Sequence, residues 1–322
     1  MQYVFLYVVL FFSLPTFPSA ITYELNGGRF GDNLSTFCKA QFFCYKTKLP
    51  PIYKEFEYSN QLGMHHHKSA THNQAHHFSK TVRVNTIDDI TKNDDGNTLF
   101  ISHFYSQTPG IYEYCLQDPV FDVLIKKMLT PIAQLPTLEK REGTFTVGLH
   151  VRKGGGFDKP LGSIQIYDRE RSLNRNNSQL PSASSKGKPQ YADQIWPTKF
   201  PPDQYYLDQL KMLRLLVGPE QMLIVYLFTD DPNPGALAER YQAYLQDPRM
   251  EFVYRANANT HDSNIIEDFY VMAQCDYLIR STSLYAKAAQ LLGAHAIILF
   301  PQHGYWDVDR VIINPLGISI RS

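Results

Sequence analysis

The chain has 322 residues, enough for one large domain or two of medium size. Hydrophobic residues make up 43% of it, aromatic residues 13% and charged residues 19%, which excludes disordered, collagen-like and coiled-coil proteins. Its 31 Lys and Arg residues balance its 31 Asp and Glu residues, and no basic stripe interleaved with aromatics occurs, so sequence-independent binding of nucleic acid is excluded as well.

The amino terminus carries the pattern of a targeting segment. Residues 1–20 contain no charged side chain, and the apolar run at 3–14 is followed by Pro15, Pro18, Ser19 and Ala20. The run is too short to cross about 30 Å of hydrocarbon comfortably. It predicts a signal peptide cut before Ile21, or else an uncleaved anchor that holds the protein on a membrane. Either predicts the secretory pathway: the Golgi or ER lumen of a eukaryote, or the periplasm or medium of a bacterium.

The first half predicts an irregular α/β domain over residues 21–140. The elements we expect in it are a strand at 21–25, a glycine-rich turn at 27–33, a helix at 34–47, a strand at 98–104, a helix at 120–129 and a linker at 135–143. We call residues 27–33 (GGRFGDN) the glycine segment.

The second half, residues 141–322, alternates strands with amphipathic helices. We expect strands at 144–151, 221–228, 251–254, 276–279 and 294–300, and helices at 203–217, 234–245, 265–274 and 284–292. This order predicts a parallel, doubly wound sheet that binds ligands beyond the carboxyl ends of its strands. Residues 160–190, rich in Ser, Asn, Arg and Lys, predict a mobile loop.

Three strand-to-helix junctions carry residues suited to an anion. Glycines in the glycine segment let a ligand approach backbone amides at a helix start, although a tight structural turn would use the same residues. At the second junction, His150 and Arg152 lie on one face of the strand, and the guanidinium of Arg152 suits a diphosphate. The alternative is a solvent-exposed loop that carries two cations and binds no ligand. The third is the hydroxyl segment (Ser281, Thr282 and Ser283), which could cradle an anion or cap a helix.

Other polar groups have plainer interpretations. Asp230 and Asp231 could hold a metal ion, but an aspartate before Pro232 and a helix is more often a cap. The cluster that runs from His65 to His77 is interpreted as a polar loop rather than a metal site. The four cysteines lack metal or redox spacing; Cys38 and Cys275 predict buried free thiols, with disulfides as the alternative.

Five segments in order resemble the fucosyltransferase superfamily, which includes α1,2-, α1,6- and protein O-fucosyltransferases. They are NGGRFGDNL, HVRKGG, FPPDQYYLDQL, LFTDD and EDFYVMAQCDYLIRSTS. The resemblance implies a GT-B-like α/β fold, in which two Rossmann-like, doubly wound domains face each other across a cleft. It also implies inverting transfer of fucose from GDP-fucose to a hydroxyl of a glycan or glycoprotein, with no cofactor and no essential metal.

The resemblance also implies a donor site. The residues that match the family's motifs are Gly28, Arg29, Phe30, Gly31, His150, Arg152, Asp268, Ser281, Thr282 and Ser283. Arg152 falls on the arginine that contacts the donor diphosphate. Lys153 stands where α1,2 enzymes usually have a second arginine, and Gly155 where they usually have an aspartate.

The implied mechanism needs charge stabilisation and a base. Arg152, Lys153 and the hydroxyl segment would stabilise the leaving nucleotide, and Asp32 or Asp158 would accept the proton of the acceptor hydroxyl. The glycine at position 155 leaves open a catalytically silent secreted protein that binds a glycan or a nucleotide. A GT-B glycosyltransferase using another nucleotide sugar is the remaining alternative.

Overall fold

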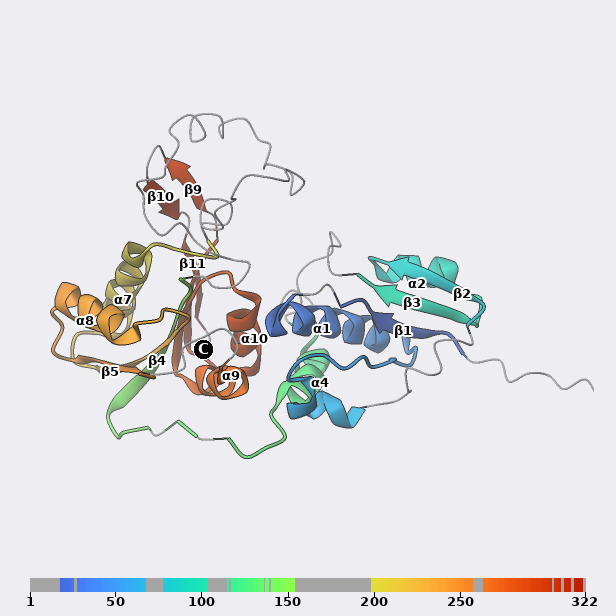
Figure 1. Ribbon diagram of the computed structural model, residues 1–322, viewed down its shortest axis with the longest axis horizontal. Helices are drawn as coiled ribbons and strands as arrows, with labels where there is room; N and C mark the ends of the chain where they lie inside the picture. The colour runs from blue at the N-terminus through green and yellow to red at the C-terminus, as the bar shows by residue number, and fades with distance from the viewer. Residues whose placement is uncertain are drawn as a thin grey trace, which may run out of the picture.

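The computed structural model has two α/β domains side by side, joined by an extended stretch of chain (Figure 1). The residues that the structure describes are 18–25, 28–67, 78–103, 115, 117–135, 137–138, 140–153, 198–256, 263–302, 304–307, 310–313 and 316–320. The predicted mobile loop at 160–190 and all but the end of the predicted targeting segment lie outside these ranges.

The first domain contains a parallel three-stranded sheet in the order β1-β3-β2. Its strands are β1 (Ala20–Tyr23), β2 (Lys80–Val84) and β3 (Thr98–Ser102). Its helices are α1 (Phe30–Thr47), α2 (Ile87–Asn93) and α4 (Pro119–Leu129), with short 3-10 helices η1 (Ser59–Gln61) and η2 (Gly63–His67). Helices α1 and α2 contact each other and pack into the same core.

Helix α1 begins at Phe30, whereas the sequence pattern predicted a start at residue 34. The reason is local, because Arg29 is extended at the N-cap and its backbone N–H donates to the Asp32 carboxylate at 3.3 Å. An acidic side chain in the first turn also suits the positive end of the helix dipole. Gly31 and Asp32 therefore belong to the helix rather than to a turn before it.

The second domain contains a six-stranded sheet in the order β11-β8-β7-β4-β5-β6. Its strands are β4 (Thr144–Val151), β5 (Met222–Thr229), β6 (Met250–Tyr254), β7 (Tyr277–Arg280), β8 (Ile297–Pro301) and β11 (Leu316–Ile320). All neighbours run parallel except β11, which is antiparallel to β8. A separate hairpin pairs β9 (Gly304–Asp307) with β10 (Arg310–Ile313).

Helices cover both faces of this sheet. One face of β4 packs with α7 (Asp203–Val217) and α8 (Pro234–Leu245), and the opposite face of the sheet packs with α9 (Ile265–Gln274) and α10 (Leu284–Leu292). Because β4 is buried on both faces, it reads as the continuous run TFTVGLHV instead of alternating. The predicted α/β class is confirmed. This domain is doubly wound, because helices cover both faces of its mostly parallel sheet.

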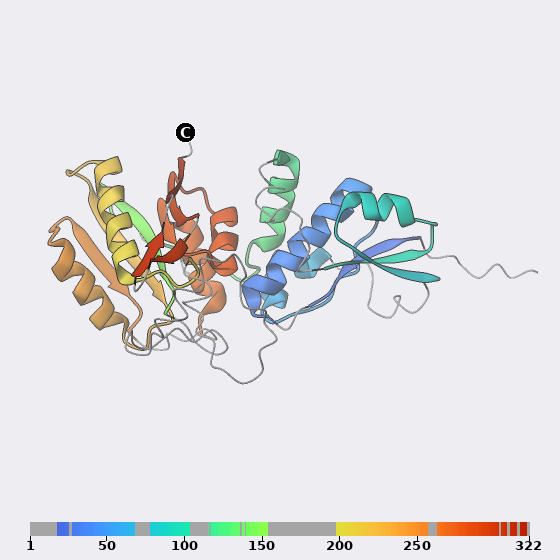
Figure 2. The same ribbon diagram turned by 90° about the horizontal axis from the view of Figure 1, so that it is seen from above.

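The two domains meet where the first turn of α1 packs on α9 and α10, and both views place the start of α1 beside α10 (Figures 1 and 2). The Phe30 ring is 5.8 Å from the Phe269 ring and 6.2 Å from the Tyr285 ring, in edge-on geometry. A Cβ atom on Gly31 would lie 2.5 Å from the Tyr285 backbone nitrogen. Only glycine allows the two helix starts to approach so closely.

Some elements were not predicted from the sequence. They are β2, α2, the 3-10 helices η1 and η2, and the three strands that follow β8. The predicted domain start at residue 21 falls inside β1, which begins at Ala20. All four cysteines are buried and free, as predicted for Cys38 and Cys275. Within the described ranges, none of the helices has the length and apolar character needed to span a bilayer.

The close approach of Gly31 to Tyr285 predicts that a Gly→Ala substitution at this helical position destabilises the protein. In a helix, Gly→Ala usually stabilises, by up to about 1 kcal/mol. We expect Gly31→Ala to lower the free energy of unfolding by about 2 kcal/mol instead, because its Cβ meets backbone atoms that cannot move aside. Urea denaturation followed by circular dichroism measures the change.

Gly235→Ala is the matched control. Gly235 is also the second residue of its helix, α8, but the atoms nearest to its Cβ would belong to the Tyr254 side chain, at 3.2 Å or more. That ring belongs to a side chain that is 40% exposed and can shift, so we expect no loss of stability. Equal effects of the two substitutions would contradict the interpretation of the Gly31 contact.

Candidate functional site

The carboxyl ends of three adjacent strands bring the chemistry-bearing residues together. Strand β4 lies between β5 and β7, with Val151 opposite Thr229 on one side and His150 opposite Arg280 on the other. The residues that follow these pairs emerge at the same edge of the sheet. They are Arg152 after β4, Asp230 after β5 and the hydroxyl segment after β7. This edge is where open α/β sheets bind ligands.

Arg152 is held by a carboxylate from the neighbouring strand. Its Nε lies 3.2 Å from Asp230 Oδ2, and the two side chains are only 12% and 8% exposed. The other oxygen, Asp230 Oδ1, accepts a hydrogen bond from the Lys153 backbone N–H at 2.6 Å. Asp230 therefore fixes both the guanidinium and the main chain that follows it.

Aromatic groups complete the support of Arg152. The guanidinium carbon lies 5.3 Å from the centre of the Phe200 ring, a cation–π distance. The Arg152 backbone N–H donates to the Tyr206 hydroxyl at 3.4 Å. Lys153 forms an ion pair with Asp203, whose carboxylate also accepts from the Tyr241 hydroxyl at 2.8 Å. Each cation at this strand end thus has a carboxylate partner, so the pairs add little net charge.

His150 is a neutral imidazole beside these cations. It is 5% exposed, and burial together with the charges of Arg152 and Arg280 lowers its pKa to about 3. Its ring lies 5.9 Å from the Tyr285 ring, and its Nδ1 has no hydrogen-bond partner among the described residues. At neutral pH it can exchange hydrogen bonds with a ligand but adds no positive charge.

The hydroxyl segment is buried at the start of α10. Ser281 and Ser283 are 0% and 3% exposed, and the Ser281 hydroxyl accepts from the Ser283 backbone N–H at 3.4 Å. Thr282 N–H donates to the Thr198 carbonyl at 2.9 Å. Ser283 is the N-cap residue of α10, and its side chain forms no capping hydrogen bond in the described structure. The amides of the first turn are therefore not satisfied by that side chain.

Arg280 adds a second buried cation next to the hydroxyl segment. It is 3% exposed, donates from Nε to Gln290 Oε1 at 2.6 Å and from Nη1 to the Ser281 carbonyl at 2.9 Å. Its guanidinium carbon lies 4.6 Å from the centre of the Phe300 ring. These contacts tie the segment to the sheet and to α10.

The glycine segment reaches the same region from the first domain. Gly31 packs against Leu284 and Tyr285, directly after the hydroxyl segment. Gly28 accepts from the Asn33 side-chain amide at 2.9 Å. The Asp32 carboxylate accepts the backbone N–H of Arg29, the N-cap residue of α1. The structure thus brings Gly31 beside the two residues that follow the hydroxyl segment, across more than 250 positions of sequence.

Asp268 lies in the first turn of α9 and pairs with Arg255 at 3.1 Å, while Glu267 pairs with the same guanidinium at 3.2 Å. Burial raises the pKa of Asp268, and the Arg255 charge opposes that effect. The nearby Ile265 carbonyl accepts from the Tyr285 hydroxyl at 2.7 Å. The first turn of α9, which carries Asp268, is therefore joined to α10 through the Tyr285 hydroxyl.

Sequence reasoning missed two groups. It weighed Asp230 as a metal ligand or a cap, but the N-cap of α8 is Asn233, and Asp230 pairs with Arg152. It assigned no role to Arg280. The sequence shows that Asp230 and Arg280 lie at strand ends. The strand order is needed to find what each of them contacts. Asp158 and Gly155 lie outside the described residues.

No metal site emerges from the part of the chain that the structure describes, since it contains no group of three or more His, Cys, Asp or Glu side chains able to hold an ion. Asp231 instead accepts from the Asn233 backbone N–H at 2.8 Å in a local turn. His72, His76 and His77 lie outside the described residues. The rings of His65 and His66 contact each other, 6.1 Å apart, at η2.

Comparisons with known proteins find similarity only among solved structures. No family model matches the sequence, and no curated protein does. The structural neighbours are fucosyltransferases. The NodZ α-1,6-fucosyltransferase, co-crystallised with GDP, is 13% identical with a TM-score of 0.47, over 94% of this chain and 98% of that one. A NodZ structure from Bradyrhizobium gives the same identity and TM-score. A mutant of Arabidopsis thaliana FUT1 in complex with GDP is 12% identical with a TM-score of 0.48, over 88% of this chain and 70% of that one.

Removal of the Asp230 charge should destabilise the second domain. Asp230→Asn keeps an acceptor for Lys153 N–H but leaves Arg152 buried without its carboxylate. We expect the free energy of unfolding to fall by about 3 kcal/mol. Urea denaturation measures it, and Asp231→Asn is the control, with an expected change within about 0.5 kcal/mol. Equal stability of the two variants would refute the role given to Asp230.

The neutral state of His150 predicts a pH dependence of stability. A free histidine has a pKa of about 6.5, so between that value and about 3 the unfolded chain binds a proton at His150 that the folded chain does not. Stability is therefore lost as the pH falls below about 6.5. When the pH falls from 7.5 to 5.5, we expect the free energy of unfolding of the protein to decrease by about 1.4 kcal/mol more than that of the His150→Gln variant. Parallel losses in urea denaturation at the two pH values would contradict a neutral His150.

Proposed function

We propose that the protein is an inverting glycosyltransferase that moves fucose from GDP-fucose to a hydroxyl group of a glycan or glycoprotein. The observation that carries the proposal is Arg152, which is 12% exposed and oriented by Asp230 at the carboxyl end of the central strand β4. The choice of fucose and of GDP rests on the resemblance of the five sequence segments to the fucosyltransferase superfamily.

The proposed chemistry follows from the charge that develops on the leaving group. As the bond from C1 of the sugar to the diphosphate breaks, the nucleotide gains negative charge, and Arg152 offers a planar set of N–H donors to its oxygens. The hydroxyl segment and the first amides of α10 lie one strand away, across the β4–β7 pair. These groups are held in place before the reaction, which keeps the cost of reorganisation low.

Lys153 and His150 have different parts in this proposal. Lys153 is paired with Asp203, as Arg152 is with Asp230, so each contributes less net charge to the diphosphate than an unpaired cation would. His150 stays neutral and serves as a hydrogen-bonding group for the donor. Phe30 and Gly31 bring the first domain against α10. In this proposal they close one side of the donor site together with Gly28 and Arg29.

The base that accepts the proton of the acceptor hydroxyl stays a proposal with two members, Asp32 and Asp158. Asp32 lies in the first turn of α1 at the domain contact, where its carboxylate also accepts from Arg29 N–H. We place the protein in the secretory pathway, or exported, on the basis of residues 1–20, and we expect transfer to need no metal.

Substitution of Arg152 tests the proposal. Arg152→Ala removes the donors aimed at the leaving diphosphate, so we expect kcat for fucose transfer to fall by about 10² to 10³. Arg152→Lys keeps the charge but loses the fork of donors, and it should recover only part of the rate. Arg141→Ala is the control, because Arg141 precedes β4 at the opposite end and pairs with Glu251 at 3.0 Å in solvent. Transfer is measured with GDP-fucose and a panel of galactoside, glucosaminide and peptide acceptors.

Calorimetric titration with GDP and UDP separates the alternatives. We expect saturable binding of GDP that is unchanged by EDTA and weakened in Arg152→Ala. Binding of UDP but not GDP would overturn the donor assignment and favour another nucleotide sugar. Binding of GDP with no transfer to any acceptor would favour a catalytically silent binding protein.

A further inference from the structure

The first residues of β1 are built into the core of the first domain. Ser19, Ala20 and Ile21 are 2%, 3% and 1% exposed. On one side, Ala20 pairs with Leu99 of β3. On the other side, Ile21 N–H donates to the Pro50 carbonyl at 3.0 Å, and its own carbonyl accepts from Ile52 N–H at 2.7 Å. The start of β1 is therefore bonded along both edges.

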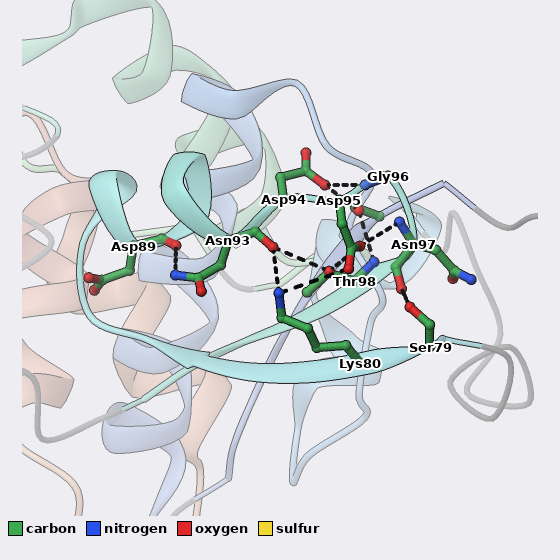
Figure 3. A network of polar contacts seen from close by, with 10 residues as sticks. Ser79, Lys80, Asp89, Asn93, Asp94, Asp95, Gly96, Asn97 and Thr98 are labelled. Atoms are coloured by element: carbon green, nitrogen blue, oxygen red, sulfur yellow. Dashed lines mark hydrogen bonds and ion pairs between the residues drawn. The ribbon is translucent and has the colours of Figure 1, made fainter.

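The Ser19 hydroxyl connects this strand to the turn before β3. It accepts from Thr98 N–H at 2.9 Å and donates to Asp94 Oδ1 at 2.5 Å. Asp94 Oδ1 also accepts from Gly96 N–H at 3.0 Å (Figure 3). Since Thr98 is 0% exposed, its N–H would lose a buried acceptor if Ser19 were absent.

The turn that receives Ser19 is itself well ordered by hydrogen bonds. Asp95 Oδ1 accepts from the Thr98 hydroxyl at 2.6 Å and from Asn97 N–H at 3.1 Å. The Ser79 hydroxyl donates to the Asn97 carbonyl at 2.8 Å, and the Lys80 ammonium donates to the Asn93 carbonyl at 3.0 Å (Figure 3). The turn that bonds Ser19 therefore also connects β2, α2 and β3.

A cut between Ala20 and Ile21 is incompatible with this arrangement. It would remove Ser19 and the first residue of β1, and it would turn the Ile21 amide into a charged amino group at a position that is 1% exposed. We propose that the mature protein keeps Ser19 and Ala20, so that any processing of the apolar amino terminus occurs at a bond on the N-terminal side of Ser19. This inference does not depend on the proposed function.

The amino terminus of the processed protein tests the proposal directly. The full chain is expressed in cells with a secretory pathway and purified, and urea denaturation verifies that the purified protein unfolds in one cooperative transition. Its first residue is then found by intact mass and terminal sequencing. We expect Ser19 or a residue before it. A cooperatively folded chain that starts at Ile21 would overturn the proposal.

A pair of serine variants tests the bond that underlies it. In the full chain, Ser19→Ala should lower the unfolding midpoint by about 3 to 6 °C, because Thr98 N–H and Asp94 lose their partner. Ser79→Ala is the matched control, because the Ser79 hydroxyl bonds the same turn but is exposed, so water can replace it. We expect it to shift the midpoint by less than about 1 °C. Equal midpoints for the two variants would remove the reason for retaining Ser19.

Discussion

The pairing of Arg152 with Asp230 is the interaction on which the candidate site depends. Both side chains are nearly buried, and each charge lowers the cost of burying the other. The pair exists because β4 and β5 are neighbours in register, which places the residue after Val151 beside the residue after Thr229. Asp230 also binds the main chain of Lys153, so one carboxylate determines both the direction of the arginine and the path of the chain that leaves the strand.

A second constraint comes from the contact between the domains. Phe30 and Gly31 begin α1 and pack on Phe269 and Tyr285, so the first domain is positioned by an apolar contact. Tyr285 also contacts the His150 ring, two residues before Arg152. Packed side chains therefore connect the first domain to the strand end. The small cavity between the domains, lined by Leu34 and Leu284 among others, is apolar and does not interrupt this contact.

Predictions from the sequence were most accurate where hydrophobic periodicity is strong. The expected helices at 203–217, 234–245, 265–274 and 284–292 coincide with α7, α8, α9 and α10. They were least accurate where a weak local signal is decided by a distant partner. Gly31 looked like part of a turn; it lies inside α1, and its need for glycine comes from the backbone of Tyr285, more than 250 residues away, which passes close to it. Strand β2 and helix α2 were missed because they are short, and most of the β2 positions are exposed.

The sequence by itself determined the α/β class, the parallel sheet of the second half and the positions of Arg152 and the hydroxyl segment at strand ends. Those properties follow from the spacing of apolar residues, which is local. Only the tertiary structure decided that Asp230 is the partner of Arg152, that Arg280 is buried behind Ser281, and that Ser19 belongs to the core of the first domain. Such pairings depend on which strands lie side by side and on which groups lose water together, and neither is encoded within any short stretch of chain.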